Sequence, residues 1–532
     1  MWRNKRRALE TADNPKAESK AQLWKYAGIF LFVCIPLISA VLFCAADGRR
    51  ISDIYIPLGG WSDEIGYYKQ VEGILSHGLP RGYFGYNQSR ALYGSLGSWG
   101  IVLLIPYVLW GFFFGWNYCS PIYANIFFCM AALAIGYFLL RPRPKQMGIF
   151  ALFWIANPFL NRYVLSGVVE AAVIMELMIV IICGEALLSE TTGLNKAPQS
   201  TGKHAPAMVC CTALTILLTL ARPYFAVFFL IPLWKAIKKR QKAWVIGLPF
   251  LAVGAEVLFF LNSHYFCAPY FSDILPFDEL FSAGAGGFIV RFFHGFVEIA
   301  KLIWYALRYP GIGVGWYYLL LAVELGIMAF WCVRRKCCGK VAPPMFFIAM
   351  AGELLVLFSI IQLYDLGEGA RHILSLIVVN AVLLVAEIPS VLPGGALAVI
   401  CILSLFRIHG ADGLPYKDSA YSAYMEILKQ QLSEAVTVTN EISYDNVVAM
   451  PTADRDSKEP DTYVSTYYGL MYAMPAGVGI SLDFQDYYDN PANIKAGYIL
   501  VHPNGEIRMK LEEIGMICVF QNEEMMVYSR RF

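Results

Sequence analysis

Residues 26–46 read YAGIFLFVCIPLISAVLFCAA, an apolar run long enough to cross the hydrocarbon core of a bilayer as a helix. In hydrocarbon, every backbone N–H and C=O group needs a partner within its own segment, so a run of this length is helical. A basic segment, RNKRR at residues 3–7, precedes it. The run is too long and too far from the start for a cleaved signal peptide. It predicts a retained signal-anchor helix, with residues 1–25 in the cytoplasm.

The rest of the chain has the same character. Of its 532 residues, 58% are hydrophobic and only 15% are charged, and the mean hydropathy is +0.52. Apolar runs near twenty residues recur, so lipid is the solvent for most of the chain. The sequence predicts an all-α polytopic membrane protein with about eleven transmembrane helices. The predicted spans cover approximately residues 26–46, 121–140, 147–163, 170–188, 207–221, 224–237, 243–261, 316–333, 344–363, 372–387 and 391–408.

Basic residues between the apolar runs predict the orientation, because short cytoplasmic loops carry an excess of Lys and Arg. With these spans, the basic clusters at 141–145, 235–242 and 334–336 all face the cytoplasm. This agreement requires the short apolar run 99–115 to lie along the outer face as a surface helix. If that run crossed the membrane, the cluster at 141–145 would fall outside.

Two long outer loops interrupt the predicted transmembrane domain, residues 26–408. The first covers residues 47–118 and the second covers 262–315, which holds another amphipathic stretch. Long ordered loops in membrane proteins usually carry function. Residues 409–532 differ again, because charged residues are frequent there, acids outnumber bases, and Pro, Asn, Asp and Gly separate short runs. They predict an extracytoplasmic α/β or α+β domain.

Within this tail, residues 419–432 show helical spacing of apolar residues, and 446–450 and 497–501 are typical of strands. Residues 502–506, HPNGE, predict a turn. The tail contains clustered tyrosines that suit either stacking on sugar rings or a packed core. It has no run of basic residues, which argues against nucleic acid as a partner. One glycosylation sequon, at Asn87, and the absence of an ER-retention signal favour a bacterial plasma membrane.

The first outer loop holds the most unusual motif. Residues 61–69 read WSDEIGYYK and residues 81–87 read RGYFGYN, so two adjacent acids, Asp63 and Glu64, are followed by aromatic and basic residues. Acids in a wet loop are often only solvated, and aromatic residues are common at the membrane interface. Composition alone therefore leaves a purely structural reading open.

A signal anchor, a long first outer loop with an Asp-Glu pair, a helix along the membrane and many further spans together resemble the polytopic glycosyltransferases of the GT-C superfamily. That superfamily includes the protein O-mannosyltransferases and the aminoarabinose transferases of lipid A. The likeness covers the architecture up to about residue 410, and its sharpest motif is Asp63-Glu64 with Tyr67 or Tyr68 after it. It implies transfer of a sugar from a polyprenyl phosphate on the outer face to a glycan, lipid or protein acceptor, usually with inversion at the anomeric carbon.

The resemblance implies roles for particular residues. Asp63, with Glu64 beside it, would accept the proton of the attacking acceptor, and positive groups would stabilise the departing phosphate. The expected phosphate-binding residues, all at the outer face, are Arg222, Arg371, His372, Lys69 and Arg81. The expected residues for the acceptor or the sugar are Tyr67, Tyr68, Glu170, Arg162 and Glu368. For the arginines, snorkelling to lipid headgroups is the simpler reading, and Glu170 could instead pair with Arg162.

No cofactor is predicted with certainty. Some members of that superfamily use a divalent metal, for which Asp63, Glu64 and Glu170 offer oxygen ligands, and the sequence leaves this open. The 13 cysteines lie mostly inside apolar runs and show no spacing typical of a disulfide framework or a zinc site. Cys337 and Cys338, beside the basic cluster 334–336, are expected to be reduced cytosolic thiols.

Three other functions compete with the favoured one. A transporter or flippase for a lipid-linked glycan would gather its polar groups near mid-membrane, whereas the charged residues placed here gather at the outer face. A polymerase or ligase of the O-antigen type would depend on bases in the later outer loop, namely Arg291, His294, Lys301 and Arg308. A non-catalytic scaffold would use only its tail for binding.

Overall fold

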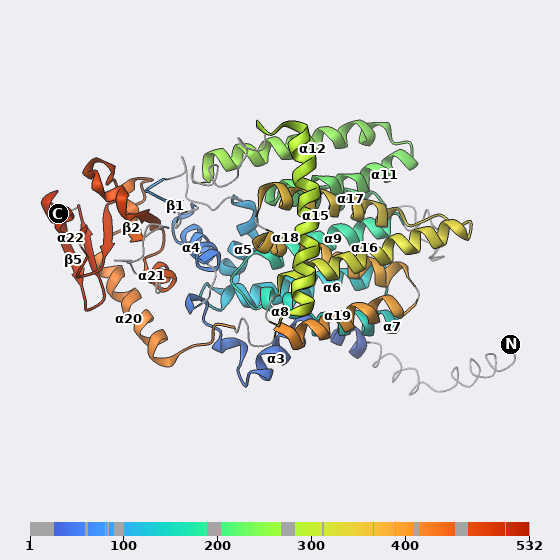
Figure 1. Ribbon diagram of the computed structural model, residues 1–532, viewed down its shortest axis with the longest axis horizontal. Helices are drawn as coiled ribbons and strands as arrows, with labels where there is room; N and C mark the ends of the chain where they lie inside the picture. The colour runs from blue at the N-terminus through green and yellow to red at the C-terminus, as the bar shows by residue number, and fades with distance from the viewer. Residues whose placement is uncertain are drawn as a thin grey trace.

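The computed structural model combines a helix bundle with a sheet domain at one end of it (Figure 1). It describes residues 26–58, 62–79, 81, 85–89, 100–188, 204–267, 282–310, 313–364, 366–388, 390–408, 414–452, 467–505 and 507–530. Among these, five helices are long and apolar enough to cross a membrane, or six if the bent pair at the start of the chain counts as one span. The chain is thus mostly helical with a small sheet, and the count of eleven spans stays a prediction.

The helices of the bundle follow the predicted spans closely. They are α3 (Ile35–Ala46), α6 (Ser120–Leu140), α7 (Pro144–Ala156), α8 (Pro158–Val164), α9 (Glu170–Leu188), α10 (His204–Ala221), α11 (Leu230–Lys238), α12 (Lys242–Phe266), α16 (Val314–Cys337), α17 (Pro344–Leu363), α18 (Leu366–Glu387) and α19 (Leu392–Ile408). The run 99–115 contains the short helix α5 (Ile105–Phe114), and its place on the membrane face stays a prediction.

Three predicted spans are not single straight α-helices. The first bends by 58° between Tyr26–Val33 and Ile35–Ala46. The span at 147–163 breaks where Asn157 caps α8 by accepting a hydrogen bond from the Leu160 N–H, with Pro158 as the first helical residue. Proline has no N–H for the preceding turn, so the helix ends there. The span at 224–237 begins as the 3₁₀-helix η6 (Pro223–Phe229) before α11.

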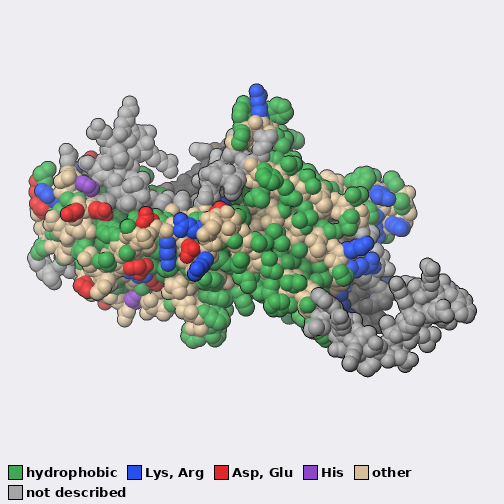
Figure 2. Space-filling model, turned by 90° about the horizontal axis from the view of Figure 1, so that it is seen from below, with side chains coloured by type: hydrophobic (Ala, Val, Ile, Leu, Met, Phe, Trp, Pro, Cys, Tyr) green, Lys and Arg blue, Asp and Glu red, His purple; other side chains and the backbone are tan. Residues whose placement is uncertain are grey.

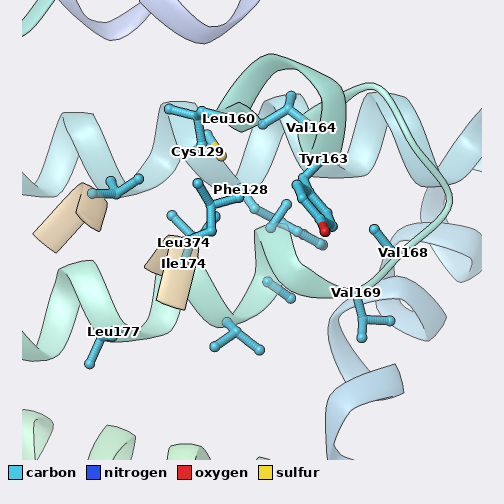
Figure 3. Close-up of a cluster of buried hydrophobic side chains, with 14 of the residues drawn as sticks. Phe128, Cys129, Leu160, Tyr163, Val164, Val168, Val169, Ile174, Leu177 and Leu374 are labelled. Atoms are coloured by element: carbon cyan, nitrogen blue, oxygen red, sulfur yellow. The ribbon is translucent and has the colours of Figure 1, made fainter. Parts of the chain in front are cut away.

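Helix α9 is the centre of the bundle. Its sequence, EAAVIMELMIVIICGEALL, is apolar on all sides, and 89% of its most apolar 18-residue stretch is buried. A helix that is apolar all round belongs in a core. Its first turns pack against side chains of α6, α8 and α18, among them Phe128, Leu160 and Leu374 (Figure 3). This packing fixes the place of Glu170, its first residue.

The second outer loop contains a long helix, α15 (Gly284–Arg308), where an amphipathic stretch was expected. It runs across the direction of α9, α16 and α17 (Figure 1). Phe293, Val297 and Trp304 are exposed on it, whereas Gly295 and Ile299 are buried. The helix thus packs one narrow face on the bundle.

The sheet domain confirms the elements predicted for the tail. Helix α20 (Ser419–Ala435) covers the predicted 419–432, and β2 (Val447–Thr452) and β4 (Tyr498–Val501) match the two predicted strands. The other elements are β3 (Gly479–Phe484), β5 (Ile517–Gln521), β6 (Met526–Ser529), α21 (Tyr467–Ala473) and α22 (Ile507–Glu513). The sheet order is β1-β3-β2-β4-β6-β5, parallel from β1 to β4 and antiparallel from β4 to β5.

The edge strand β1 (Gly85–Tyr86) comes from the first outer loop and not from the tail. Gly85 pairs with Ser481 and Tyr86 with Leu482. Beside it, the Gln88 side-chain oxygen accepts hydrogen bonds from the backbone N–H groups of Lys495 and Ala496, at 2.5 and 2.8 Å. The first loop and the tail therefore form one folded unit.

Candidate functional site

Helix α4 (Ser62–His77) lies in the first outer loop, between the bundle and the sheet domain (Figure 1). Asp63 and Glu64 stand in its first turn, where the partial positive charge of a helix N-terminus favours carboxylates. Asp63 and Tyr67 are four residues apart and share one face. Tyr68 and Glu72 share another. The helix thus presents two different sets of side chains, one to the bundle and one to the tail.

On the bundle side, Asp63 meets the end of α18. The Arg371 guanidinium donates a hydrogen bond from Nη1 to Asp63 Oδ2 at 2.5 Å. Asp63 is 41% exposed and Arg371 is 24% exposed, so the pair is open to solvent on one side. Arg371 Nε also lies 3.8 Å from Glu170 Oε1, which joins this pair to the start of α9.

Behind this pair lies a second, fully buried one. Arg222 Nη2 donates to Glu170 Oε1 at 2.9 Å, and these side chains are 2% and 4% exposed. Arg222 follows the last residue of α10 and precedes Pro223, which begins η6. A buried guanidinium and carboxylate compensate one another's charge. Glu170 also stands at the N-terminus of α9, where a negative charge is favoured.

His372 and Tyr224 complete the cluster. Arg222 Nη1 donates to the Tyr224 hydroxyl at 3.1 Å and contacts His372 Nδ1, and the same hydroxyl lies 3.1 Å from His372 Nδ1. The Tyr364 ring packs on the His372 ring, with 5.0 Å between the two centroids. Here we name Asp63, Glu170, Arg222, Arg371, His372 and Tyr224 the charged cluster.

Tyr67 lies beside the charged cluster. Burial raises the pKa of its phenol well above the ordinary value, and the charges of Asp63, Arg371, Glu170 and Arg222 all act on it. The phenol is therefore neutral at physiological pH and can donate a hydrogen bond.

Glu64 is the neighbour of Asp63 in sequence but lies in a different environment. It is 3% exposed, and its Oε1 accepts a hydrogen bond from the Gly167 N–H at 3.2 Å. Burial raises its pKa to about 8, an effect that the Arg162 guanidinium only partly offsets. Its Oε2 has no hydrogen-bond partner among the described residues. This acid anchors α4 to the segment between α8 and α9.

Two of the residues expected to bind phosphate lie elsewhere. Lys69 is fully buried, pairs with Glu72 and donates to the Met474 carbonyl oxygen at 2.6 Å. Arg81 donates to the backbone oxygens of Thr439, at 2.6 Å, and of Asn440. Both side chains hold the first loop against the tail, away from the Asp63–Arg371 pair.

The structure also separates the remaining expected residues. Tyr68 turns to the tail side of α4 and stacks on Trp116, with 5.5 Å between the ring centroids. Arg162 acts electrostatically on Glu64, whereas Glu170 forms its ion pairs with Arg222 and Arg371. The Glu368 side chain lies outside the described residues.

A metal site is not evident in the part of the chain that the structure describes. No group of three or more His, Cys, Asp or Glu side chains there is placed to hold a metal ion. Asp63 and Glu170 instead face arginines, and Glu64 faces a backbone N–H.

The bases expected for a polymerase or ligase do not form a comparable centre. His294 and Lys301 both lie on α15 and are 70% and 54% exposed. Each interacts with Glu298 on the same helix, at 3.7 and 2.6 Å. Arg308 lies over the neighbouring Tyr309 ring. These are local surface contacts.

Sequence reasoning missed Tyr224 as part of the cluster. It follows Arg222 by two residues, and only the short break of Pro223 between two apolar runs marks the place. A tyrosine beside a predicted outer arginine is a weak signal, because aromatic residues are common at the membrane interface.

No family model and no curated protein sequence matches this chain. Among solved structures, it is similar to ArnT from Cupriavidus metallidurans bound to undecaprenyl phosphate, with 13% identity over 94% of this chain and 97% of that one and a TM-score of 0.47. It is also similar to the oligosaccharyltransferase of Archaeoglobus fulgidus in the apo form, with 11% identity over 90% of this chain and 69% of that one and a TM-score of 0.48.

The same archaeal enzyme, AglB, matches in its complex with an inhibitory peptide and a dolichol-phosphate, again with 11% identity and a TM-score of 0.48 over 90% of this chain and 69% of that one. ArnT and AglB are GT-C glycosyltransferases, the class that the sequence resembles.

Proposed function

We propose that this chain is a membrane glycosyltransferase that moves a sugar from a polyprenyl-phosphate donor to an acceptor hydroxyl on the extracytoplasmic face, with inversion. The observation that carries the proposal is the charged cluster. A solvent-accessible carboxylate, Asp63, lies 2.5 Å from Arg371, and a buried Glu170–Arg222 pair lies directly behind. One part of the cluster can accept a proton, and the other can hold an anion.

The donor phosphate is the natural ligand for Arg371. Its planar guanidinium suits phosphate oxygens, and its present partner Asp63 is partly exposed and replaceable. A phosphate that binds Arg371 would compete with Asp63 and release its carboxylate. Arg222 is held in place by Glu170, so it supplies a fixed positive charge without reorganisation. Undecaprenyl phosphate in ArnT and dolichol-phosphate in AglB are lipids of the proposed class.

The proposed reaction is a single displacement. The acceptor oxygen attacks the anomeric carbon, and its proton passes to the Asp63 carboxylate. The bond from the anomeric carbon to the phosphate oxygen breaks, and its electron pair stays on that oxygen. Arg371 and Arg222 stabilise the charge that grows there, and the His372–Tyr224 contact holds Arg222 in orientation.

The placement of charges on the molecule supports an extracytoplasmic site. On the face that Figure 2 shows, basic side chains gather at the end of the bundle farthest from the sheet domain and in a second group at the border of the sheet domain, and most acidic ones lie on the sheet domain. The last turn of α16 holds Arg334, Arg335 and Lys336, and the last turn of α11 holds Lys235 and Lys238. Cytoplasmic loops are rich in such residues, which supports an external position for the charged cluster.

The test is Asp63→Asn in the purified protein, assayed with a polyprenyl-phosphate sugar in vesicles. Asparagine keeps the shape of the side chain but cannot take the proton, so we expect transfer to fall by roughly 10²–10⁴-fold with an unchanged melting temperature. Asp489→Asn makes the same change on the exposed surface of the sheet domain, where Asp489 pairs with Lys510, and should leave transfer intact. Full activity in the Asp63 variant would refute the proposed role.

A further inference from the structure

A cavity of about 610 Å³ lies between the first outer loop and the tail. This volume is within the roughly 300–1,000 Å³ typical of small-molecule sites. Its walls come from three regions, namely the segments before and within α4, the turn between α5 and α6, and helices α20 and α21. Its lining includes Tyr55, Tyr68, Trp116, Tyr118, Lys417 and Lys429. We name it the junction pocket.

Aromatic rings make up much of the wall. Tyr55 contacts Tyr118 and Tyr472, with ring centroids 5.1 and 5.9 Å apart, and Tyr68 contacts Trp116 and Tyr472 at 5.5 Å each. The Trp116 indole N–H is already bonded to the Tyr68 carbonyl oxygen at 3.1 Å. Such a wall offers flat apolar surfaces of the kind on which the C–H face of a sugar ring can pack.

Two lysines place positive charge in the same space. Lys417 Nζ lies 4.4 Å from the centroid of the Tyr118 ring, and Lys429 Nζ lies 4.5 Å from that of Tyr472. Lys429 also pairs with Glu72 at 3.1 Å, a carboxylate shared with the buried Lys69. Because both amines stand beside the rings, a cationic ligand would be repelled from the aromatic faces.

The remaining polar groups suit hydroxyls. The Tyr55 hydroxyl is buried and has no hydrogen-bond partner among the described residues, although Tyr55 lines the pocket. A buried hydroxyl without a partner is costly, which indicates that a ligand or water completes it. Glu426 accepts a bond from Tyr472 at 2.9 Å through one oxygen, and Ser419 and Ser422 add two hydroxyls to the wall.

We propose that the junction pocket binds a saccharide that carries an anionic group, a carboxylate or a phosphate. The rings pack on the sugar, Lys417 and Lys429 bind the anion, and the Tyr55 hydroxyl and Glu426 bind sugar hydroxyls. Adjacent residues of α4, Tyr67 and Tyr68, face the charged cluster and the junction pocket respectively. If the proposed function holds, on which this last step rests, the pocket holds a distal part of the acceptor.

Binding can be measured by isothermal titration calorimetry on the full-length protein in detergent. The probes are tetragalacturonate for the carboxylate, glucose 1-phosphate for the phosphate, and maltotetraose as a neutral saccharide. We expect at least one anionic probe to bind saturably and more tightly than maltotetraose. The variant K417Q/K429Q should weaken that binding by roughly tenfold or more, because charge-assisted hydrogen bonds are lost. Lys510→Gln, which removes one positive charge on α22, should not affect it.

The double variant K417R/K429R separates lost charge from lost fold, since it keeps both charges and should retain binding. Absence of binding by both anionic probes, unchanged affinity in K417Q/K429Q, or a preference for tetramethylammonium would each overturn the proposal. Asp63→Asn should bind the anionic probe normally. If that variant also keeps transfer, the proposed function fails while the pocket stands. If it loses transfer but no anionic probe binds, only the pocket fails.

Discussion

Asp63 and Glu64 are neighbours in sequence with opposite electrostatic situations. Asp63 is partly exposed and accepts a hydrogen bond from the Arg371 guanidinium. Glu64 is buried against Gly167, and desolvation raises its pKa to about 8. Of the two, only Asp63 is open to solvent and paired with a guanidinium. The acidic pair therefore divides into one candidate base and one anchoring residue.

The raised pKa of Glu64 predicts a pH dependence of stability. The folded protein keeps this proton at pH values where the unfolded chain, with an ordinary pKa of 4.5, has lost it. The contribution of Glu64 to the free energy of unfolding is therefore greatest below about pH 4.5, and it falls as the pH rises to about 8. Glu64→Gln imitates the protonated acid, so its melting temperature between pH 5 and 8 should lack this decline.

The matched control for this pH series is Glu434→Gln, which changes an exposed acid on α20. It should show the same decline in melting temperature as the unmodified protein. A Glu64→Gln variant that declines just as steeply would contradict the assignment of the proton to Glu64.

The positions of some site residues could be predicted from the sequence, and those of others could not. Arg222 and Arg371 were placed at the outer face because they end or begin apolar runs, and the structure brings both to Glu170. Lys69 and Arg81 met the same criterion of charge and location, yet they bind backbone oxygens of the tail. Those oxygens lie 405 and 358 residues away in the chain, and no local pattern indicates them.

At the scale of elements, length and hydropathy predicted the helices well, because lipid leaves a long apolar segment no alternative. The spans 121–140 and 344–363 match α6 and α17 within one residue at each end. The break at Asn157 was missed, since a capping side chain inside an apolar run does not interrupt its hydropathy. Helix α4 was missed as well, because its two functional faces leave no apolar stripe.

Helices α15 and α16 pack closely at Gly315. A Cβ added there would lie 2.1 Å from the Leu302 carbonyl oxygen, a contact that the backbone cannot relieve. Gly315→Ala should therefore separate the two helices and lower the melting temperature by several degrees, as expected for a loss of roughly 1–3 kcal/mol.

Gly326 provides the matched control on the same helix. No atom lies within 4 Å of a Cβ added there, so alanine meets open space and gains about 1 kcal/mol in helix propensity. Gly326→Ala should leave the melting temperature unchanged or raise it. Equal effects of the two substitutions would contradict the close packing of α15 on α16.

At the scale of the whole molecule, the basic and acidic ends of Figure 2 predict which thiols are reached from each side of the membrane. Cys337 and Cys338 are exposed near the basic end, and Cys518 is exposed in the sheet domain. In a variant that keeps only Cys518, a membrane-impermeant maleimide should label intact cells. In a variant that keeps only Cys337, labelling should require permeabilised cells. The reverse pattern would invert the proposed topology.

The origin of β1 has a consequence for how the protein is made. The Gln88 N–H donates to the side-chain oxygen of Ser481, which is translated 393 residues later. Contacts at such sequence separation form late in folding. If translation stopped after α19, the bundle helices could insert, but α4 would lack its contacts with the tail. Translation of the tail would thus complete the contacts that hold α4 beside the charged cluster.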